Sequence, residues 1–231
     1  MNDIIRKRKS IRKFDSNPLD FHELEKIKAQ LKQLTPLYPN IGYSINITDK
    51  TKGMFNIKAP HYLIFTSEDK SGYLENIGFV GQQMDLWLAE NGLGSCWLGA
   101  SKPEEKTSPL SHVICIAFGK PAEPLHRELS GFKRKALAEI SEGDDPRLEA
   151  ARLAPSGVNA QNWYFIADDG KIHCYRKKLG ALKALMFEKL SQIDLGIAVC
   201  HIAQETDSFS FARDDGAPQR KGLVYVGTIQ R

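Results

Sequence analysis

The chain contains 231 residues, of which 42% are hydrophobic, and its 32 basic and 28 acidic side chains leave a formal net charge of +4. This length and composition predict a globular protein with one large domain or two small ones. The modest charge argues against a wide nucleic-acid surface, and no stretch approaches the roughly 20 apolar residues of a membrane span. The amino-terminal segment is too charged for a signal peptide. We therefore expect a cytoplasmic protein without nucleic-acid or membrane partners.

The cysteines and histidines do not indicate a disulfide framework or a metal site. The four cysteines include no CxxC pair, and the six histidines show no HxH or HExxH spacing. We expect each cysteine to pack as a small apolar residue.

The first part of the chain alternates helical and strand patterns. Asp20 followed by Glu23 is a capping-box pattern at the start of an amphipathic helix, and Pro36 follows its end. A second helix is so apolar that it should be central to the fold, and Gly92 and Gly94 end it. The predicted elements are a helix over 21–34, a strand over 61–69, a helix over 75–92, an extended segment over 95–99 and a strand over 112–121.

The second part of the chain repeats this order. It predicts a strand and hairpin over 162–176, an apolar helix over 191–208, an extended segment over 209–213 and a strand over 222–230. Superposing Ile77 on Ile193 aligns the two apolar helices, and superposing Gly119 on Gly227 aligns the two last strands, at low identity. We expect two similar halves, 1–140 and 141–231, that pack their helices together and leave a groove at the interface.

Two segments carry groups suited to a bound ligand. Around Ser10, the side chains of Arg8, Lys9 and Arg12 offer the cations and the hydroxyl that a phosphate monoester needs, although a charge run is by default a solvated face. The segment APSGVNAQNW, residues 154–163, places several amides beside aromatic residues. These amides indicate either a pocket for a flat polar ligand or an ordinary loop between a helix and a strand.

A third segment, GLGSCWLG over 92–99, is rich in glycine. It follows a helix instead of opening one after a strand, so it is no dinucleotide fingerprint, and a Walker loop is absent from the sequence. A glycine turn of this kind leaves backbone N–H groups free, and these could serve a ligand.

Together these motifs resemble the FMN-dependent nitroreductase family. RKSIRKFDSNPLD resembles its Arg-Arg-Ser-x-Arg-x-Phe opening, APSGVNAQNW its Ala-Pro-Ser-x-x-Asn-x-Gln-Pro-Trp segment, GLGSCWLG its Gly-x-Gly-x-Cys-Trp-x-Gly turn, and FGKPAEP with FKRKALAEI its closing segment. The Ala-Pro-Ser segment, which in that family follows soon after the amino terminus, here begins the second half. The resemblance therefore implies a nitroreductase-like α+β fold, with antiparallel-rich sheets packed with central helices, as an intrachain pseudo-dimer that is a monomer or a weak homodimer.

The resemblance also implies the residues that bind FMN. It assigns the phosphate to Arg8, Lys9, Ser10, Arg12, Arg134 and Lys135, and the ring to Ser95, Cys96, Trp97, Leu98 and Gly99 from the first half and Pro155, Ser156, Gly157, Asn159 and Gln161 from the second. Asn162 replaces the usual proline of the motif, and Asn56 is a further candidate. We expect one flavin site, because the second half lacks its own basic and Cys-Trp segments.

The expected activity is that of an FMN-dependent oxidoreductase. The flavin carries the chemistry, so no catalytic side chain is implied, and NADH or NADPH is the expected reductant of a nitroaromatic, quinone or similar planar acceptor. The alternatives are a flavin enzyme of another reaction type and a non-catalytic protein that binds FMN or another small ligand. A nucleic-acid-binding module built on residues 6–13 is a weaker alternative, because no binding motif accompanies the cluster.

Overall fold

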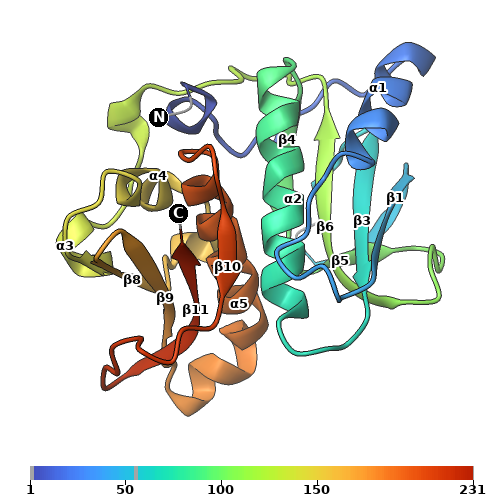
Figure 1. The fold of residues 1–231 in the computed structure, drawn as a ribbon. Coiled ribbons are helices and arrows are strands. Elements are labelled where there is room, and N and C mark those ends of the chain that lie inside the picture. Colours follow the sequence, from blue (N-terminus) through green and yellow to red (C-terminus); the bar gives the residue numbers. More distant parts are fainter. Residues whose placement is uncertain (1–2, 55–56, 231) are drawn as a thin grey trace.

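The computed structural model describes residues 3–54 and 57–230, in which two long helices lie between two large, mainly antiparallel sheets (Figure 1). The helices are α1 (Phe21–Leu31), α2 (Tyr73–Glu90), α3 (Leu137–Ile140), α4 (Leu148–Leu153) and α5 (Ala181–Ala203), with the 3-10 turns η1 (Asp3–Arg6), η2 (Leu129–Gly131) and η3 (Gly157–Asn159). The strands are β1 (Tyr43–Thr48), β2 (Thr51–Gly53), β3 (His61–Ser67), β4 (Gly94–Leu98), β5 (Ser101–Pro103), β6 (Ser111–Gly119), β7 (Ser141–Glu142), β8 (Trp163–Asp168), β9 (Lys171–Lys177), β10 (Ser210–Ala212) and β11 (Leu223–Gln230).

The two sheets share one topology. The first has the strand order β1-β3-β6-β4, and the second contains β8-β9-β11-β10 in the corresponding order, with β7 added parallel to β8. In each sheet these four strands are antiparallel to their neighbours, and in each half the long helix joins the second strand to the short edge strand. The recurring order in the sequence thus corresponds to a recurring strand topology, and the fold is of the α+β class.

The long helices α2 and α5 cross at a pair of glycines. A Cβ atom on Gly78 would lie 2.1 Å from the carbonyl oxygen of Ile193, and one on Gly196 would lie 2.0 Å from the carbonyl oxygen of Glu75. The reciprocal contact is that of a two-fold related pair, in which Gly78 corresponds to Gly196 and Glu75 to Ile193. Glu75, and not Ile77 as the sequence suggested, is therefore the counterpart of Ile193.

Most predicted elements are present with shifted ends. The capping box at α1 is confirmed, since Asp20 accepts from the backbone N–H of Glu23 and the Glu23 side chain accepts from that of Asp20, but the helix ends at Leu31. The helix α5 begins at Ala181, ten residues before the predicted start. The strand β1 was not predicted; each of its residues is half-buried, so its sequence shows no alternation of apolar and polar positions.

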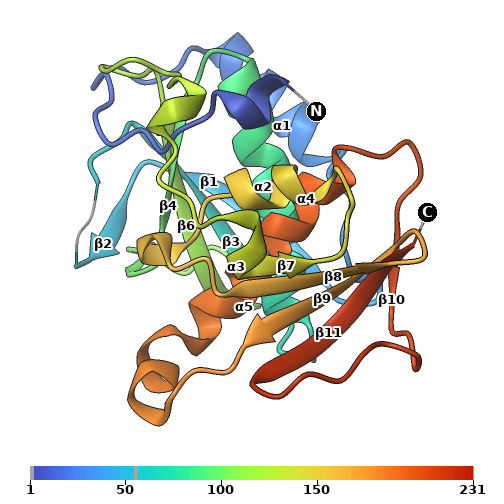
Figure 2. The same ribbon diagram turned by 90° about the vertical axis from the view of Figure 1, so that its left-hand side faces the viewer.

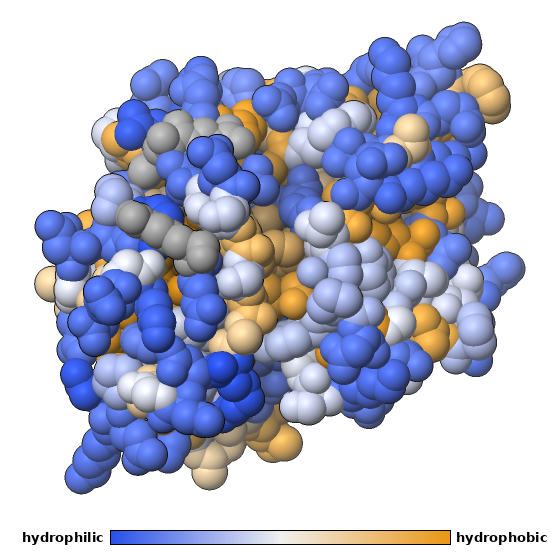
Figure 3. All heavy atoms as spheres, in the orientation of Figure 1, coloured by the Kyte–Doolittle hydropathy of each residue, from blue (hydrophilic) through white to orange (hydrophobic). Residues whose placement is uncertain are grey.

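The surface combines a hydrophilic cover with a few apolar areas. On the face shown in Figure 3, hydrophobic residues reach the surface mainly in its centre, between the two halves, and beside α1.

No helix in the described ranges is both long and apolar enough to cross a bilayer. Within those ranges no group of three or more histidine, cysteine or acidic side chains is placed to hold a metal ion, and the four cysteines are buried and unpaired.

Candidate functional site

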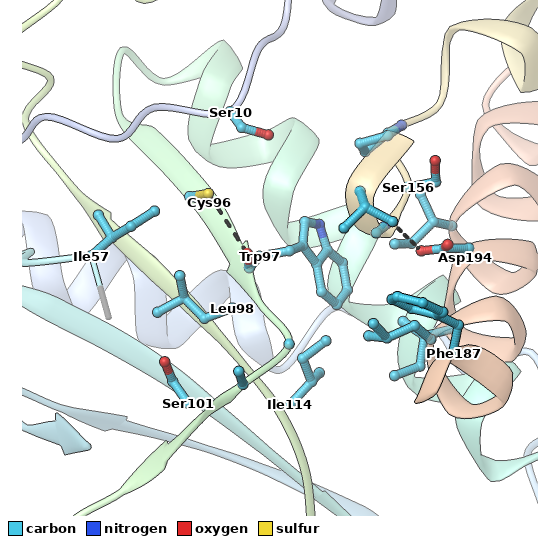
Figure 4. A pocket seen from close by; sticks show the side chains of 18 of the residues that line it. Ser10, Ile57, Cys96, Trp97, Leu98, Ser101, Ile114, Ser156, Phe187 and Asp194 are labelled. Atoms are coloured by element: carbon cyan, nitrogen blue, oxygen red, sulfur yellow. Dashed lines mark hydrogen bonds between the residues drawn. The ribbon is translucent and has the colours of Figure 1, made fainter. Parts of the chain in front are cut away.

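A cavity of about 580 Å³ lies where the two halves meet (Figure 4). One wall is β4, which is an edge strand of its sheet, and the other is formed by η3 and the middle of α5, residues 186–197. Ser10 and Arg12 of the amino-terminal segment also line it, and Met54, Val158 and Met186 are exposed lining residues. In Figure 2, β2, η3 and the first turns of α5 lie along the same side of the molecule. The volume is in the range of sites for small molecules and cofactors.

Nine of the residues proposed from the sequence line this cavity. They come from three segments that are far apart in the chain: Ser10 and Arg12; Cys96, Trp97, Leu98 and Gly99; and Pro155, Ser156 and Gly157. The other seven lie outside its lining: Arg8, Lys9, Ser95, Arg134, Lys135, Asn159 and Gln161. Asn56 falls outside the described residues.

Arg8 is buried behind the cavity in an ion pair. Its Nε lies 2.9 Å from Oδ2 of Asp85, and its Nη2 donates to Oγ of Ser10 over 3.4 Å. Asp85 on α2 is fully buried, and it also accepts from Oγ of Ser95 over 2.5 Å and from Nε2 of Gln82 over 2.8 Å. Arg8 and Ser95 therefore fix the amino-terminal segment and β4 to α2.

The same network continues into the second half through His201. Its Nε2 lies 3.1 Å from Nε2 of Gln82, and its Nδ1 lies 3.0 Å from the carbonyl oxygen of Ala150. Burial, and next the positive charge of Arg8, lower the pKa of His201 to about 3. The ring is therefore neutral, with the Nδ1 proton donated to Ala150 and Nε2 accepting from Gln82. The network joins α2 to α4 and α5 across the interface.

A cluster of arginines lies near Arg8. Burial, and then the charges of Arg8 and Arg12, lower the pKa of Arg127 to about 10. Burial, and then the charges of Arg127, Arg8 and Arg152, lower the pKa of Arg134 to about 9. Crowded cations that oppose one another's charge favour the binding of an anion, because the anion relieves the repulsion. Arg127 is not among the residues predicted from the sequence, because it stands alone between His126 and Glu128 without a basic run.

The amides of Asn159 and Gln161 hold this basic segment in place. Oδ1 of Asn159 accepts from Nη1 of Arg134 over 2.7 Å, and its Nδ2 donates to the carbonyl oxygen of Lys133 over 2.8 Å. Oε1 of Gln161 accepts from the backbone N–H of Lys135 over 2.7 Å. The amide-rich loop of the second half therefore positions the basic segment of the first, while direct contact of these amides with a flavin ring stays a prediction.

Lys9 points to a different partner. Its Nζ lies 3.3 Å from Oε2 of Glu123, whose Oε1 accepts from the backbone N–H groups of Arg12 and Lys13 over 2.7 and 3.2 Å. These backbone hydrogen bonds, that of Arg12 first, lower the pKa of Glu123. Glu123 thus fixes the backbone from which the Arg12 side chain reaches the cavity.

The loop at the cavity mouth has an unusual backbone. Val158, Asn159 and Gln161 have φ values of 48°, 56° and 48°, in the left-handed region that residues other than glycine rarely adopt. This conformation is most costly for Val158, because its side chain is β-branched. The residue is also 77% exposed. Strained conformations of this kind gather at ligand sites, where the surrounding hydrogen bonds hold them.

Several polar atoms around the cavity have no partner among the described residues. They are Nη1 of Arg8, Nε of Arg134 and Nε1 of Trp97. The ring of Trp97 is fixed by its packing, since it stacks on Phe65 with centroids 6.2 Å apart and leaves no room for a Cβ atom on Gly81. Unpaired buried donors are costly, and a ligand with acceptor atoms would satisfy them.

Residues 1–206 match the family described as "Putative TM nitroreductase". The chain belongs to this nitroreductase family. A general oxidoreductase role follows from the membership. A search of curated proteins finds no match.

Comparison with solved structures finds a similar fold along nearly the whole chain. A structure described as a "putative nitroreductase" from Thermotoga maritima superposes with a TM-score of 0.64 at 22% identity, covering 98% of this chain and 90% of its own. A nitroreductase family protein from Clostridium difficile 630 has a TM-score of 0.48 at 16% identity and covers 60% of this chain and 96% of its own. An FMN-dependent nitroreductase from Clostridium difficile R20291 has a TM-score of 0.45 at 18% identity and covers 58% of this chain and 95% of its own. At 22% identity, the match to the Thermotoga maritima structure along nearly the whole chain shows the fold alone.

At the two-fold related counterpart of the cavity, aromatic side chains pack together. The edge strand β10 takes the place of β4, and Phe211 from it contacts Tyr38 edge to face with centroids 5.8 Å apart. Beside this contact, Phe79 of α2 stacks on Phe209 at 5.4 Å. The loop, the edge strand and the helix that would form a second site are thus packed against one another.

Proposed function

We propose that the protein is an FMN-dependent oxidoreductase that passes electrons from NADH or NADPH to a nitroaromatic, a quinone or a similar planar acceptor. The observation that carries this proposal is the cavity between the halves, which has mostly apolar walls and a nearby cluster of arginines whose positive charges repel one another. FMN has a flat ring and a phosphate on a flexible chain. The ring matches the apolar cavity, and the phosphate matches the arginine cluster. The motifs shared with FMN-dependent nitroreductases and the membership in a nitroreductase family support it.

The donor set suits a phosphate. Arg8, Arg127 and Arg134 would hold it together with the hydroxyl of Ser10, because two negative charges are best matched by guanidinium groups and directed hydrogen bonds. The unpaired nitrogens of Arg8 and Arg134 are the atoms that such an anion would satisfy. In this assignment Lys9, which pairs with Glu123, contributes to the general positive potential.

The two walls suit a flat ring. Residues 96–99 along the edge of β4 and residues 155–157 on the opposite side would enclose it, and an edge strand leaves backbone groups free to bind it. Arg12 adds a positive charge to the lining, which favours a ring that becomes anionic on reduction. When bound, FMN supplies the electron transfer; the chain orients it and limits the access of water.

The proposed function is tested with the purified protein. We expect it to quench the fluorescence of added FMN with saturation, to bind riboflavin much more weakly because riboflavin lacks the phosphate, and to oxidise NADH or NADPH when menadione is present. A protein that binds neither flavin contradicts the proposal. Bound FMN that does not react with NADH or NADPH would instead favour a flavin enzyme of another reaction type.

Replacing Arg134 or Arg127 with glutamine is expected to weaken FMN binding by about tenfold to hundredfold, because each change removes a charge-assisted contact worth roughly 1.5–3 kcal/mol. Binding of riboflavin should change little. The matched control is Lys13→Gln, which removes an exposed positive charge from the same region. An equal loss of affinity for FMN and riboflavin would show that the arginines act on the structure of the site and not on the phosphate.

A single chain carries both walls of the site, so we also propose that the monomer is the functional unit. Each half supplies one wall, and the counterpart of the cavity is filled. The expected stoichiometry is one FMN per chain, measured from the flavin absorbance of the saturated protein. Two FMN molecules per chain would contradict this part of the proposal.

A further inference from the structure

A carboxyl group of the second half faces the cavity without a cation beside it. Asp194 on α5 lines the cavity and its side chain extends from the helix toward the η3 loop (Figure 4). Its Oδ1 accepts from the backbone N–H of Gly157 over 2.9 Å, and no hydrogen bond to Oδ2 and no ion pair to Asp194 is found in the described part of the chain. The residue is only 4% exposed. Burying a carboxylate in this way is costly, so its presence calls for a reason beyond packing.

The internal two-fold relation provides a comparison within the same chain. Because Glu75 corresponds to Ile193 and Gly78 to Gly196 at the helix crossing, Asn76 corresponds to Asp194. Oδ1 of Asn76 accepts from the backbone N–H of Tyr38 over 2.9 Å, as Oδ1 of Asp194 accepts from that of Gly157.

The loops that donate these hydrogen bonds also match. Tyr38 is the third residue of Pro36-Leu37-Tyr38, and Gly157 is the third residue of Pro155-Ser156-Gly157. An amide therefore suffices to anchor this loop to the helix. The half whose site is filled carries the amide, and the half whose site is open carries the acid.

We propose that Asp194 is the acid that delivers a proton to the acceptor reduced in this cavity. The inference rests on the proposed function. Reduction of a quinone to a hydroquinone takes up two electrons and two protons: the reduced cofactor supplies both electrons and one proton as a hydride equivalent, and Asp194 supplies the second proton to the quinone oxygen. The carboxylate left on Asp194 then takes up a proton from the buffered solvent that reaches the open mouth.

The surroundings of Asp194 raise the pH at which its carboxyl loses the proton to near neutrality. Burial raises the pKa of its carboxyl to about 7, against the opposing effect of the Gly157 hydrogen bond. Within the cavity lining, the other titratable side chains are Arg12 and Cys96, and burial raises the pKa of the Cys96 thiol.

The elements packed against Asp194 add no positive charge that would ionise it. The η3 turn carries no titratable side chain, and Glu75 of α2 lies 3.7 Å from Nε of Arg176 on β9. On α4, Glu149 and Arg152 pair with each other. A carboxyl with a pKa near neutral pH matches the requirement for a general acid.

The test compares Asp194→Asn with the wild type. Asparagine keeps the acceptor for the Gly157 N–H, as Asn76 shows in the other half, but has no proton to give. We expect FMN affinity within about twofold of the wild type, and reoxidation of the reduced enzyme by menadione that is about a hundredfold slower at pH 6. Reduction by NADH or NADPH should be unchanged. In the wild type the reoxidation rate should fall as the pH rises through about 7, because Asp194 loses its proton, and this fall should be absent in Asp194→Asn.

Two further variants and one spectroscopic readout complete the experiment. Asp194→Glu restores an acid and should recover part of the rate with its pH dependence, whereas Asp168→Asn, which removes an exposed carboxyl, should leave both unchanged. In the protein without flavin, the infrared band of a protonated carboxyl should disappear as the pH rises through about 7, and it should be missing in Asp194→Asn. A wild type that binds no FMN overturns the proposed function and this inference with it. Normal FMN binding with an unaltered rate and pH profile in Asp194→Asn overturns this inference alone.

Discussion

Replacing Gly196 with alanine is expected to lower the free energy of unfolding by about 3 kcal/mol or more, as measured by urea denaturation. The added Cβ would lie 2.0 Å from the carbonyl oxygen of Glu75, and a clash with backbone cannot be relieved by rotating a side chain. The helices α2 and α5 must then move apart, which loosens the apolar contacts along the interface between the halves. Ile193 and Asp194 line the cavity on α5, so FMN affinity should fall as well.

The sign of the stability change in Gly196→Ala distinguishes a steric clash from the effect of helix propensity. In the middle of a helix, alanine is intrinsically more favourable than glycine by about 1 kcal/mol, so helix propensity alone predicts that the variant is more stable. The matched control is Gly180→Ala at the start of the same helix, where nothing lies within 4 Å of the added Cβ, and it should change stability by less than about 1 kcal/mol. Gly78→Ala should behave like the Gly196 variant, since it meets the carbonyl oxygen of Ile193. A stable Gly196→Ala protein would refute the close crossing of the two helices.

The two long helices were predictable from the sequence only in part, and their crossing was not. Apolar composition sufficed to predict α2 and the second part of α5, because these two segments are buried on almost all sides. It did not reveal the first ten residues of α5, where Leu182 and Leu185 are 76% and 86% exposed and a buried stripe is therefore missing. The register between the helices could not be read from the apolar pattern, since it depends on which glycine lets two backbones touch.

The candidate site was predictable where a motif carries its own residues. The Cys-Trp turn and the Ala-Pro-Ser loop are short contiguous motifs, and residues of both line the cavity. The positions of Asn159 and Gln161 were not predictable in the same way, because their amides bind Lys133, Arg134 and Lys135 from a distant segment. Arg127 and Asp194 are single residues outside any motif. Their importance depends on tertiary structure, because only the fold brings the arginines together and buries the acid.

The network around Asp85 connects the stability of the fold to the candidate phosphate site. Asp85 is fully buried and binds Arg8, Ser95 and Gln82, so it fixes elements that surround the cavity without lining it. A buried ion pair contributes little net stability compared with apolar residues, yet loss of one partner leaves an uncompensated charge in the interior. Arg8 therefore has two separable roles: neutralising Asp85 and offering its unpaired Nη1 to an anion.

Replacing Arg8 with methionine is expected to lower the free energy of unfolding by about 3–5 kcal/mol, because Asp85 remains buried without its cation. The double variant Arg8→Met with Asp85→Asn removes that charge and should recover most of the stability, since asparagine still accepts a hydrogen bond from Ser95. FMN affinity, measured by fluorescence quenching, should stay low in both variants because the guanidinium group is missing from each. As a control, Arg152→Met breaks the partly exposed pair with Glu149 and should cost less than about 1 kcal/mol. Recovery of FMN affinity together with stability in the double variant would show that Arg8 supports the fold and leaves the phosphate to the other arginines.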